Sequence, residues 1–266
     1  MDIARCFYHA FHITKNIIAT HGLEAPCYVF IMKNTLLFIT LIFGIFACKN
    51  TSENTPSKAK PNMENTTTKT AQNTSTESDI KWMKMGYDLE KIRPTGLKAG
   101  VKAPDFTLKA PNGEVIKLSE EIKKQPVVLM FYRGQWCPLC TRYLAAFQES
   151  VPQIAAKGAK VIAITPETNE NIAKTVEKTK ISFTILHDTN ESVMSDYKVL
   201  FSVTDDYQDR IRKGKQMDIA MNNGKTAAQL PEPATYVIGQ DGIIKFAQFD
   251  LNYKNRASVE DILKHL

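Results

Sequence analysis

An unbroken apolar run that leads into a pair of cysteines is the feature that most constrains how this chain folds. Residues 127–132 read VVLMFY, which predicts a buried central strand. Apolar residues spaced three or four apart then predict a helix from about Pro138 to Ala156. Cys137 and Cys140 therefore lie where a buried strand gives way to the start of a helix.

This position favours thiol–disulfide chemistry. Two intervening residues on a first helical turn bring two sulfurs close enough to bridge, and the free N–H groups at a helix start stabilise a thiolate. Cys137, at the exposed end, is expected to be the acidic nucleophile, and Cys140 the resolving cysteine. Lowering a cysteine pKa from about 8.5 to about 7 makes roughly half of it thiolate at neutral pH. Arg133 and Arg142 add positive charge nearby.

Three other uses of the cysteine pair are open alternatives. A structural zinc site needs about four ligands, and the domain offers only His187 and His265 besides the two cysteines. A copper-carrying protein with this cysteine pair would also need a histidine ligand, and His187 is the candidate. An inert structural disulfide would close so short a loop that it adds little stability. We favour redox catalysis and expect no metal and no cofactor.

The remaining pattern predicts an α/β fold: a thioredoxin-like, central mixed sheet flanked by helices, with an N-terminal hairpin. Residues 198–232 are a long, polar and basic connection with a helix expected around 207–212, and such insertions often carry recognition. The other expected elements are a hairpin (106–109 and 115–118), strands (161–164 and 183–186), helices (169–178, 191–197 and 258–266) and a strand pair (235–238 and 243–249).

The segment before the domain has the features of a lipoprotein signal peptide. Residues 32–48 combine Lys33, an apolar run of about a dozen residues and a lipobox-like end at Cys48, where acyl chains would anchor the protein. An uncleaved membrane helix over residues 28–47 is the alternative. Because a signal peptide should begin a protein, we expect translation to start at Met32.

The expected organisation follows from these boundaries. Residues 1–31 are expected to be an untranslated or disordered upstream stretch, and 32–48 the signal peptide. Residues 49–79 are rich in Ser, Thr, Asn, Lys and Glu, which predicts a disordered tether. Residues 80–266 form the folded domain. The net charge of +6 comes from scattered lysines, so no nucleic-acid partner is expected.

The domain resembles the peroxiredoxin-like branch of the thioredoxin superfamily, the alkyl hydroperoxide reductase and thiol-specific antioxidant group, in its C-x-x-C form. The segment FYRGQWCPLC, residues 131–140, is the most specific part of the likeness. The other matching segments are residues 100–106, 164–167 and 233–242, and the Asp250–Tyr253 segment leading to Arg256.

The sequence departs from typical members of that group at the site. Their motif F-Y-P-x-x-x-T-x-x-C places its proline on Arg133, its threonine on Cys137 and its attacking cysteine on Cys140. The resemblance alone would therefore make Cys140 the attacking cysteine. An arginine of typical members is replaced here by Pro233, which resembles the thioredoxin proline that faces the C-x-x-C pair. Trp136, just before the pair, also resembles thioredoxins.

The resemblance implies an enzyme that reduces hydroperoxides through a dithiol–disulfide cycle and is re-reduced by a thioredoxin-like dithiol donor. One alternative is an envelope thiol–disulfide reductase or isomerase that acts on protein disulfides. Another is a non-enzymatic, tethered binding module. The expected location is the bacterial cell envelope, where a lipid anchor at Cys48 would hold the domain facing the periplasm or the exterior.

Overall fold

The computed structural model describes residues 76–266. Its helices are α2 (Glu77–Lys84), α3 (Leu118–Lys124), α4 (Pro138–Gln148), α5 (Val151–Ala156), α6 (Asn169–Thr179), α7 (Ser192–Asp196), α8 (Asp205–Lys215), α9 (Ile219–Asn222) and α10 (Val259–Lys264). Its strands are β1 (Tyr87–Asp88), β2 (Thr107–Lys109), β3 (Val115–Lys117), β4 (Val127–Phe131), β5 (Lys160–Thr165), β6 (Thr184–His187), β7 (Leu200–Val203), β8 (Gln229–Pro231), β9 (Thr235–Ile238) and β10 (Ile244–Gln248).

A five-stranded mixed sheet in the order β10-β9-β4-β5-β6 organises the domain. β4 pairs in parallel with β5, which pairs in parallel with β6, whereas β9 is antiparallel to both β4 and β10. β2 and β3 pair antiparallel at the place of the expected hairpin. The predicted mixed sheet flanked by helices is therefore confirmed.

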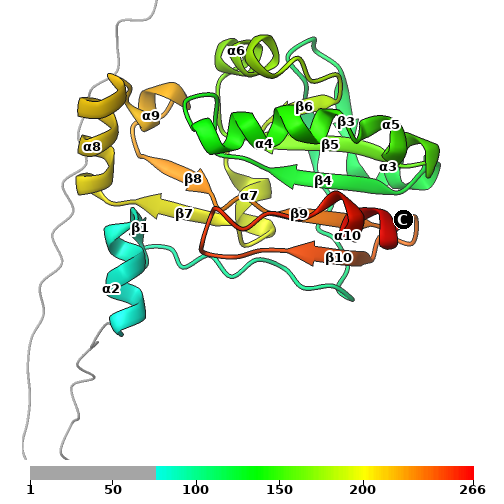
Figure 1. Cartoon of the computed structure of the whole chain (residues 1–266), viewed down its shortest axis with the longest axis horizontal. Helices are drawn as coiled ribbons and strands as arrows, with labels where there is room; N and C mark the ends of the chain where they lie inside the picture. The colour runs from blue at the N-terminus through cyan, green and yellow to red at the C-terminus, as the bar shows by residue number, and fades with distance from the viewer. Residues whose placement is uncertain (1–75) are drawn as a thin grey trace, which may run out of the picture. The chain divides into compact units, whose positions relative to one another are not determined.

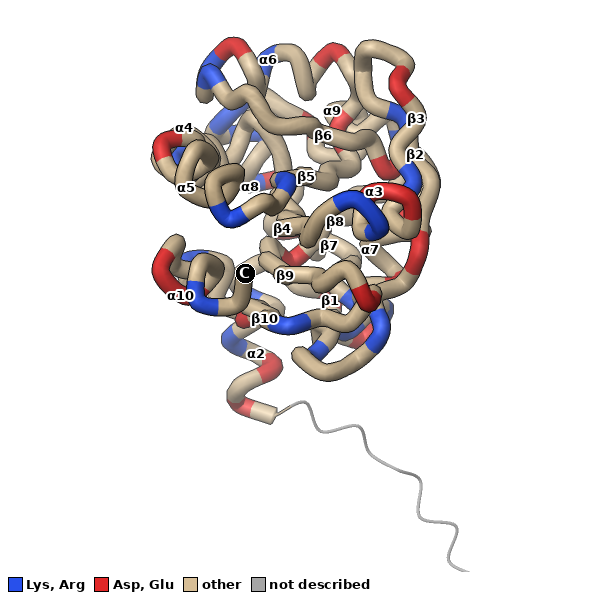
Figure 2. Tube along the Cα trace, turned by 90° about the vertical axis from the view of Figure 1, so that its right-hand side faces the viewer, with Lys and Arg blue, Asp and Glu red and all other residues tan. Residues whose placement is uncertain are grey.

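The central strand β4 separates two apolar layers. Val128 and Met130 contribute to a core that includes residues of α4, α5, α6 and α10. The alternate residues, among them Leu129, contribute to a second core on the other face with residues of α3, α7 and β3. Figure 2 shows these layers on opposite sides of the sheet. Because both faces are covered, β4 carries apolar side chains at every position, as the sequence run predicted.

The prediction of a single helix from Pro138 to Ala156 is wrong. The chain forms α4 and then, after Glu149 and Ser150, a separate helix α5 with Pro152 in its first turn. Proline lacks the backbone N–H that a helix interior needs, but it is tolerated in a first turn. The break therefore falls just before Pro152, and it leaves the start of α4 unchanged.

The connection over residues 198–232 is more ordered than the sequence indicated. It contains β7, α8, α9 and β8, and β7 pairs with β8 and with β1. The helix expected around 207–212 is confirmed as the longer α8. Figure 1 shows α8 at the end of the central sheet where β4 leads into α4. The connection thus forms a wall beside the cysteine pair.

The expected signal peptide, Cys48 and the upstream stretch all lie outside the described residues. Helix α2 begins at Glu77, so the last residues assigned to the tether are helical and the ordered part starts before residue 80. Thr76 caps this helix by accepting a hydrogen bond from the Asp79 N–H at 3.2 Å. Among residues 76–266, no helix has the length and apolar character needed to cross a membrane.

Candidate active site

A short loop carries the chain from β4 to the cysteine pair at the start of α4. Cys137 is the N-cap residue and Pro138 opens the helix, a position that suits proline because its missing N–H would have no helical partner. The Cys137 N–H donates to the Gly134 carbonyl at 3.1 Å, and the Cys137 carbonyl accepts from the Thr141 N–H at 3.1 Å. The helix start therefore holds Cys137 in a defined geometry, one turn before Cys140.

Both thiols are free and buried in this structure. Cys137 is 5% exposed and Cys140 1%. The expectation that Cys137 lies at an exposed end is therefore wrong, because α8 and the loop after β10 cover it. Cys137 still lines a surface hollow of about 340 Å³, and Cys140 does not. A small reactant can reach only Cys137 from that hollow.

The two cysteines have opposite acidities. A hydrogen bond from the Cys140 thiol, followed by the charge of Arg133, the Cys140 backbone N–H and the charge of Arg256, lowers the pKa of Cys137 to about 6, against the effect of burial. Burial, the hydrogen bond to Cys137 and its negative charge raise the pKa of Cys140 well above its usual value. At pH 7, Cys137 is therefore mostly thiolate, while Cys140 keeps its proton.

Arg133 occupies a buried polar cluster beside Cys137. Its side chain is 1% exposed, and its guanidinium donates to the Tyr87 hydroxyl at 2.9 Å and to Glu232 Oε2 at 3.4 Å. The Tyr87 hydroxyl in turn donates to Glu232. The guanidinium carbon lies 4.2 Å from the centroid of the Tyr253 ring, a cation–π contact. Burial raises the pKa of Glu232 to about 8, and Arg133 limits that rise.

Arg256 approaches the pair, and Pro233 the end of β4, from other parts of the chain. The Phe131 N–H donates to the Ala234 carbonyl at 2.9 Å, so the antiparallel pairing of β4 and β9 brings the buried Pro233 beside the end of β4. Arg256 Nη2 lies 3.8 Å from Cys140 Sγ. Of the two arginines expected near the pair, Arg133 is buried in the cluster, and the exposed Arg142 lines the hollow with Cys137.

Trp136 and the loop before it pack against a buried carboxyl group. Glu167, which follows β5, accepts hydrogen bonds from the Gln135 N–H at 2.8 Å and from the Asn222 amide at 3.1 Å. Burial raises the pKa of Glu167 to about 7. A Cβ at Gly134, where φ is +151°, would lie 2.7 Å from both Glu167 Oε1 and Trp136 Nε1. This loop conformation therefore requires glycine.

Sequence reasoning did not identify Tyr87, Glu232 or Glu167 as site residues. Glu232 carried one usable signal, since it is an acidic residue in the otherwise uncharged stretch 229–235. A buried charge needs a partner, and Arg133 in the apolar segment after β4 has the matching charge. No sequence pattern around Tyr87 indicates that it contacts Arg133 and Glu232.

The histidines named for the metal alternatives lie away from the pair. His187 ends β6, and His265 packs against Phe246 in a tilted arrangement with ring centroids 5.1 Å apart. Neither lines the hollow that contains Cys137. Within residues 76–266, no group of three or more His, Cys, Asp or Glu side chains is placed to hold a metal ion.

Comparison with known proteins places this chain in a family. The family model described as the AhpC/TSA family matches residues 99–247. A chloroplastic peroxiredoxin Q of Sedum lineare is 26% identical over 167 residues, which cover 63% of this chain and 76% of the relative. The peroxiredoxin Bcp of Bacillus subtilis (strain 168) is 33% identical over 103 residues, covering 39% of this chain and 65% of the relative.

Solved structures show the same fold. The crystal structure of a mutant of peroxiredoxin 6 of Arenicola marina superimposes with a TM-score of 0.50 at 16% identity, covering 63% of this chain and 71% of that one. The predicted thioredoxin-like fold is therefore confirmed. Homology to peroxiredoxins indicates an enzyme of the thiol-dependent peroxidase class. With a family model that matches more than half of its length, the chain belongs to the AhpC/TSA family.

Proposed function

We propose that the protein reduces hydroperoxides through a disulfide cycle between Cys137 and Cys140, with Cys137 as the attacking cysteine. The observation that carries this proposal is the asymmetry of the pair. Cys137 has a pKa lowered to about 6 and opens into a surface hollow, whereas Cys140 is sealed and has a raised pKa. A nucleophile must be both ionised and reachable, and only Cys137 meets both conditions.

The first step is peroxide reduction at Cys137. Its thiolate attacks the terminal peroxide oxygen, so that an S–O bond forms as the O–O bond breaks. The leaving alkoxide takes a proton from solvent and departs as an alcohol, or as water when the substrate is hydrogen peroxide. Cys137 is then a sulfenic acid, oxidised by two electrons.

The second step joins the two cysteines. Cys140 attacks the Cys137 sulfur, the S–O bond breaks, and the thiol proton of Cys140 leaves with the hydroxide as water. The guanidinium of Arg256, 3.8 Å from Cys140 Sγ, favours the developing thiolate of Cys140 during this attack. A thioredoxin-like dithiol donor then reduces the disulfide and supplies two electrons and two protons.

A peroxide-consumption assay on the full chain tests this order. With dithiothreitol or a thioredoxin as donor, Cys137→Ser should abolish turnover. Without a donor, Cys140→Ser should consume one equivalent of peroxide per chain and leave a sulfenic acid or a mixed disulfide on Cys137, detectable by mass spectrometry. Trapping on Cys140 in the Cys137→Ser protein would reverse the order. Reduction of a protein disulfide with no peroxide consumption would refute the peroxidase proposal.

We also propose that Cys48 is lipidated and anchors the domain to a membrane of the bacterial cell envelope. The support is the signal-like sequence of residues 32–48. Cys48→Ser should move the protein from the membrane fraction to the soluble fraction of the producing cells. Continued membrane association of that variant, or mature protein that retains residues before Met32, would contradict this proposal.

A further inference from the structure

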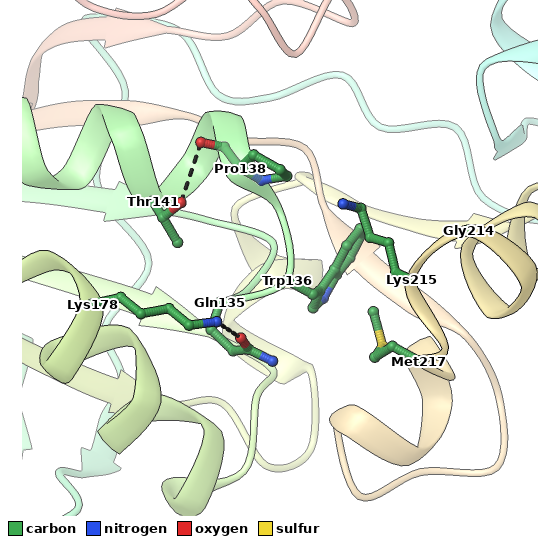
Figure 3. Close-up of a pocket in the computed structure, with 8 residues that line it drawn as sticks. All are labelled: Gln135, Trp136, Pro138, Thr141, Lys178, Gly214, Lys215 and Met217. Carbon is green, nitrogen blue, oxygen red and sulfur yellow. Dashed lines mark hydrogen bonds between the residues drawn. The ribbon is translucent and has the colours of Figure 1, made fainter.

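Two hollows meet beside the cysteine pair. The first, of about 340 Å³, contains Cys137 and has apolar walls from α4, α8 and the loop after β10, among them Leu139, Tyr207 and Ile211. The second, of about 520 Å³, lies between the start of α4, the end of α8 and α6, and Figure 3 shows the side chains that line it. Trp136, Pro138 and Lys215 line both hollows. The two hollows therefore adjoin at these three side chains, and we refer to them together as the Cys137 groove.

The groove is positively charged. Arg142, Lys215 and Lys254 line the first hollow, and Lys178 and Lys215 line the second. All four side chains are exposed, and none forms an ion pair within residues 76–266. Neither hollow has an aspartate or glutamate in its lining. The charges come from α4, α6, α8 and the loop after β10, so they surround the groove on several sides.

A neighbouring hollow gives the contrast. It lies between α6 and α8–α9 and is lined by Lys174 and Arg212 together with Glu170 and Asp218. There Lys174 pairs with Glu170 at 3.0 Å, and Arg212 pairs with Asp218 at 2.6 Å. Cations beside that hollow are neutralised by the protein itself. The four cations beside the Cys137 groove have no carboxylate partner within residues 76–266, so they can pair with the carboxylates of a ligand.

We infer that the groove binds an acidic polypeptide segment of the dithiol protein that re-reduces the enzyme. This inference rests on the dithiol cycle proposed above. A small hydroperoxide would occupy one hollow and has at most one or two charges to match. Four cations spread over both hollows suit an extended ligand with several carboxylates. In the second hollow, Gln135 Oε1 accepts from Lys178 Nζ, and the Thr141 hydroxyl donates to the Pro138 carbonyl at 3.2 Å. The Gln135 NH₂ group remains as a donor, and Thr141 Oγ1 as an acceptor, for a peptide backbone.

The bound segment delivers its thiolate to Cys137. That thiolate attacks Cys137 Sγ, the bond between the two enzyme sulfurs breaks, and Cys140 leaves as a thiolate that takes up a proton. The donor's second thiol then attacks the donor sulfur of the mixed disulfide and releases Cys137 as a thiolate. The donor loses two electrons and the enzyme gains them. Only Cys137 faces the groove, so only one mixed disulfide is expected.

Synthetic dithiol peptides test the inference on the full chain. Diamide forms the Cys137–Cys140 disulfide without peroxide, so the donor test is independent of the peroxidase assay. One peptide carries aspartates beside its C-x-x-C, and its match carries asparagines there. Rates of reduction are read by alkylation and mass spectrometry of the peptide containing Cys137, which avoids interference from Cys6, Cys27 and Cys48. Each rate is divided by that of uncharged dithiothreitol on the same variant.

The acidic peptide should react about tenfold faster than its match at low salt, and the advantage should vanish near 1 M salt. Lys215→Glu should remove that advantage. Lys213→Glu is the matched control, since Lys213 is exposed on the same helix and lines neither hollow. It should change the ratio less than twofold.

Equal rates for the two peptides would overturn the inference, as would equal losses in Lys215→Glu and Lys213→Glu. So would an effect of Lys215→Glu confined to an anionic small hydroperoxide, which would make the groove a substrate site. Absence of peroxide consumption would refute the proposed function alone, because the donor rates are measured on disulfide made with diamide.

Discussion

Removal of the Cys140 side chain should raise the pKa of Cys137, because a hydrogen bond from Cys140 contributes most to the acidity of the attacking thiol. Cys137 has a pKa of about 6 against the ordinary cysteine value of about 8.5. That difference corresponds to about 3 kcal/mol of thiolate stabilisation. A hydrogen bond to a charged group contributes about 1.5–3 kcal/mol, which is about one to two pKa units.

Three variants separate this hydrogen bond from the other contributions. Cys140→Ala removes the donor, and the pKa of Cys137 should rise to about 7–8. Cys140→Ser keeps an O–H donor at the same position, so its pKa should lie between those of the wild type and Cys140→Ala. Arg133→Met, which removes the larger of the two charge contributions, should also raise the pKa of Cys137, through loss of electrostatic attraction rather than of a hydrogen bond.

The assay is the pH dependence of iodoacetamide alkylation at Cys137, followed by mass spectrometry. The rate should show a midpoint near pH 6 in the wild type and a shifted midpoint in each variant. An unchanged midpoint in Cys140→Ala would refute the reasoning and assign the acidity to the arginines and the helix start. Equal midpoints in Cys140→Ser and Cys140→Ala would show that the donor atom at residue 140 is irrelevant.

Three further predictions concern the surroundings of the pair. Burial raises the pKa of Glu167 in the folded protein from 4.5 to about 7. Between these pH values the folded state binds more protons than the unfolded chain does. The free energy of unfolding should therefore fall by up to about 3 kcal/mol as the pH rises from about 4.5 to 7. Glu167→Gln should flatten this slope in urea unfolding measured at pH 5 and pH 8, and an identical slope in the variant would contradict the assignment. Gly134→Ala should lower the free energy of unfolding by about 1–3 kcal/mol, because of backbone strain and the contact with Glu167. The control Gly214→Ala in α8 places its Cβ where no atom lies within 4 Å, so it should be neutral or stabilising. Equal effects of the two substitutions on stability would exclude the clash. Arg256→Met should slow disulfide formation after peroxide treatment, because the guanidinium no longer stabilises the Cys140 thiolate. Stopped-flow fluorescence in a Trp82→Phe background, where Trp136 is the remaining tryptophan, measures this step, and an unchanged rate would remove Arg256 from it.

The central part of the fold could be predicted because it follows from short-range patterns. The apolar run of β4 has side chains on two buried faces, and its length and position identify it as a central strand. Cys137 and Cys140 are separated by one helical turn, so their proximity is fixed by local geometry alone. The break between α4 and α5 was missed because the apolar spacing continues across it, although Pro152 marks it.

The surroundings of the pair could not be predicted, since they depend on contacts between distant segments. Arg133 and Glu232 are 99 residues apart, and Arg256 and Cys140 are 116 apart. No local rule gives the burial of Cys137 either, because the helix that covers it, α8, belongs to a connection whose path depends on the pairing of β7 with β1 and β8.

The sequence by itself determined that two cysteines would sit at the start of a helix after a buried strand, since hydrophobic periodicity and helix capping act over a few residues. The helix start also predicted that Cys137 is the acidic thiol, but only the tertiary structure decided which cysteine is reachable and which neighbouring groups shift the two pKa values. Charge interactions, burial and surface shape depend on distances through space, and those distances are set when remote segments pack around Cys137.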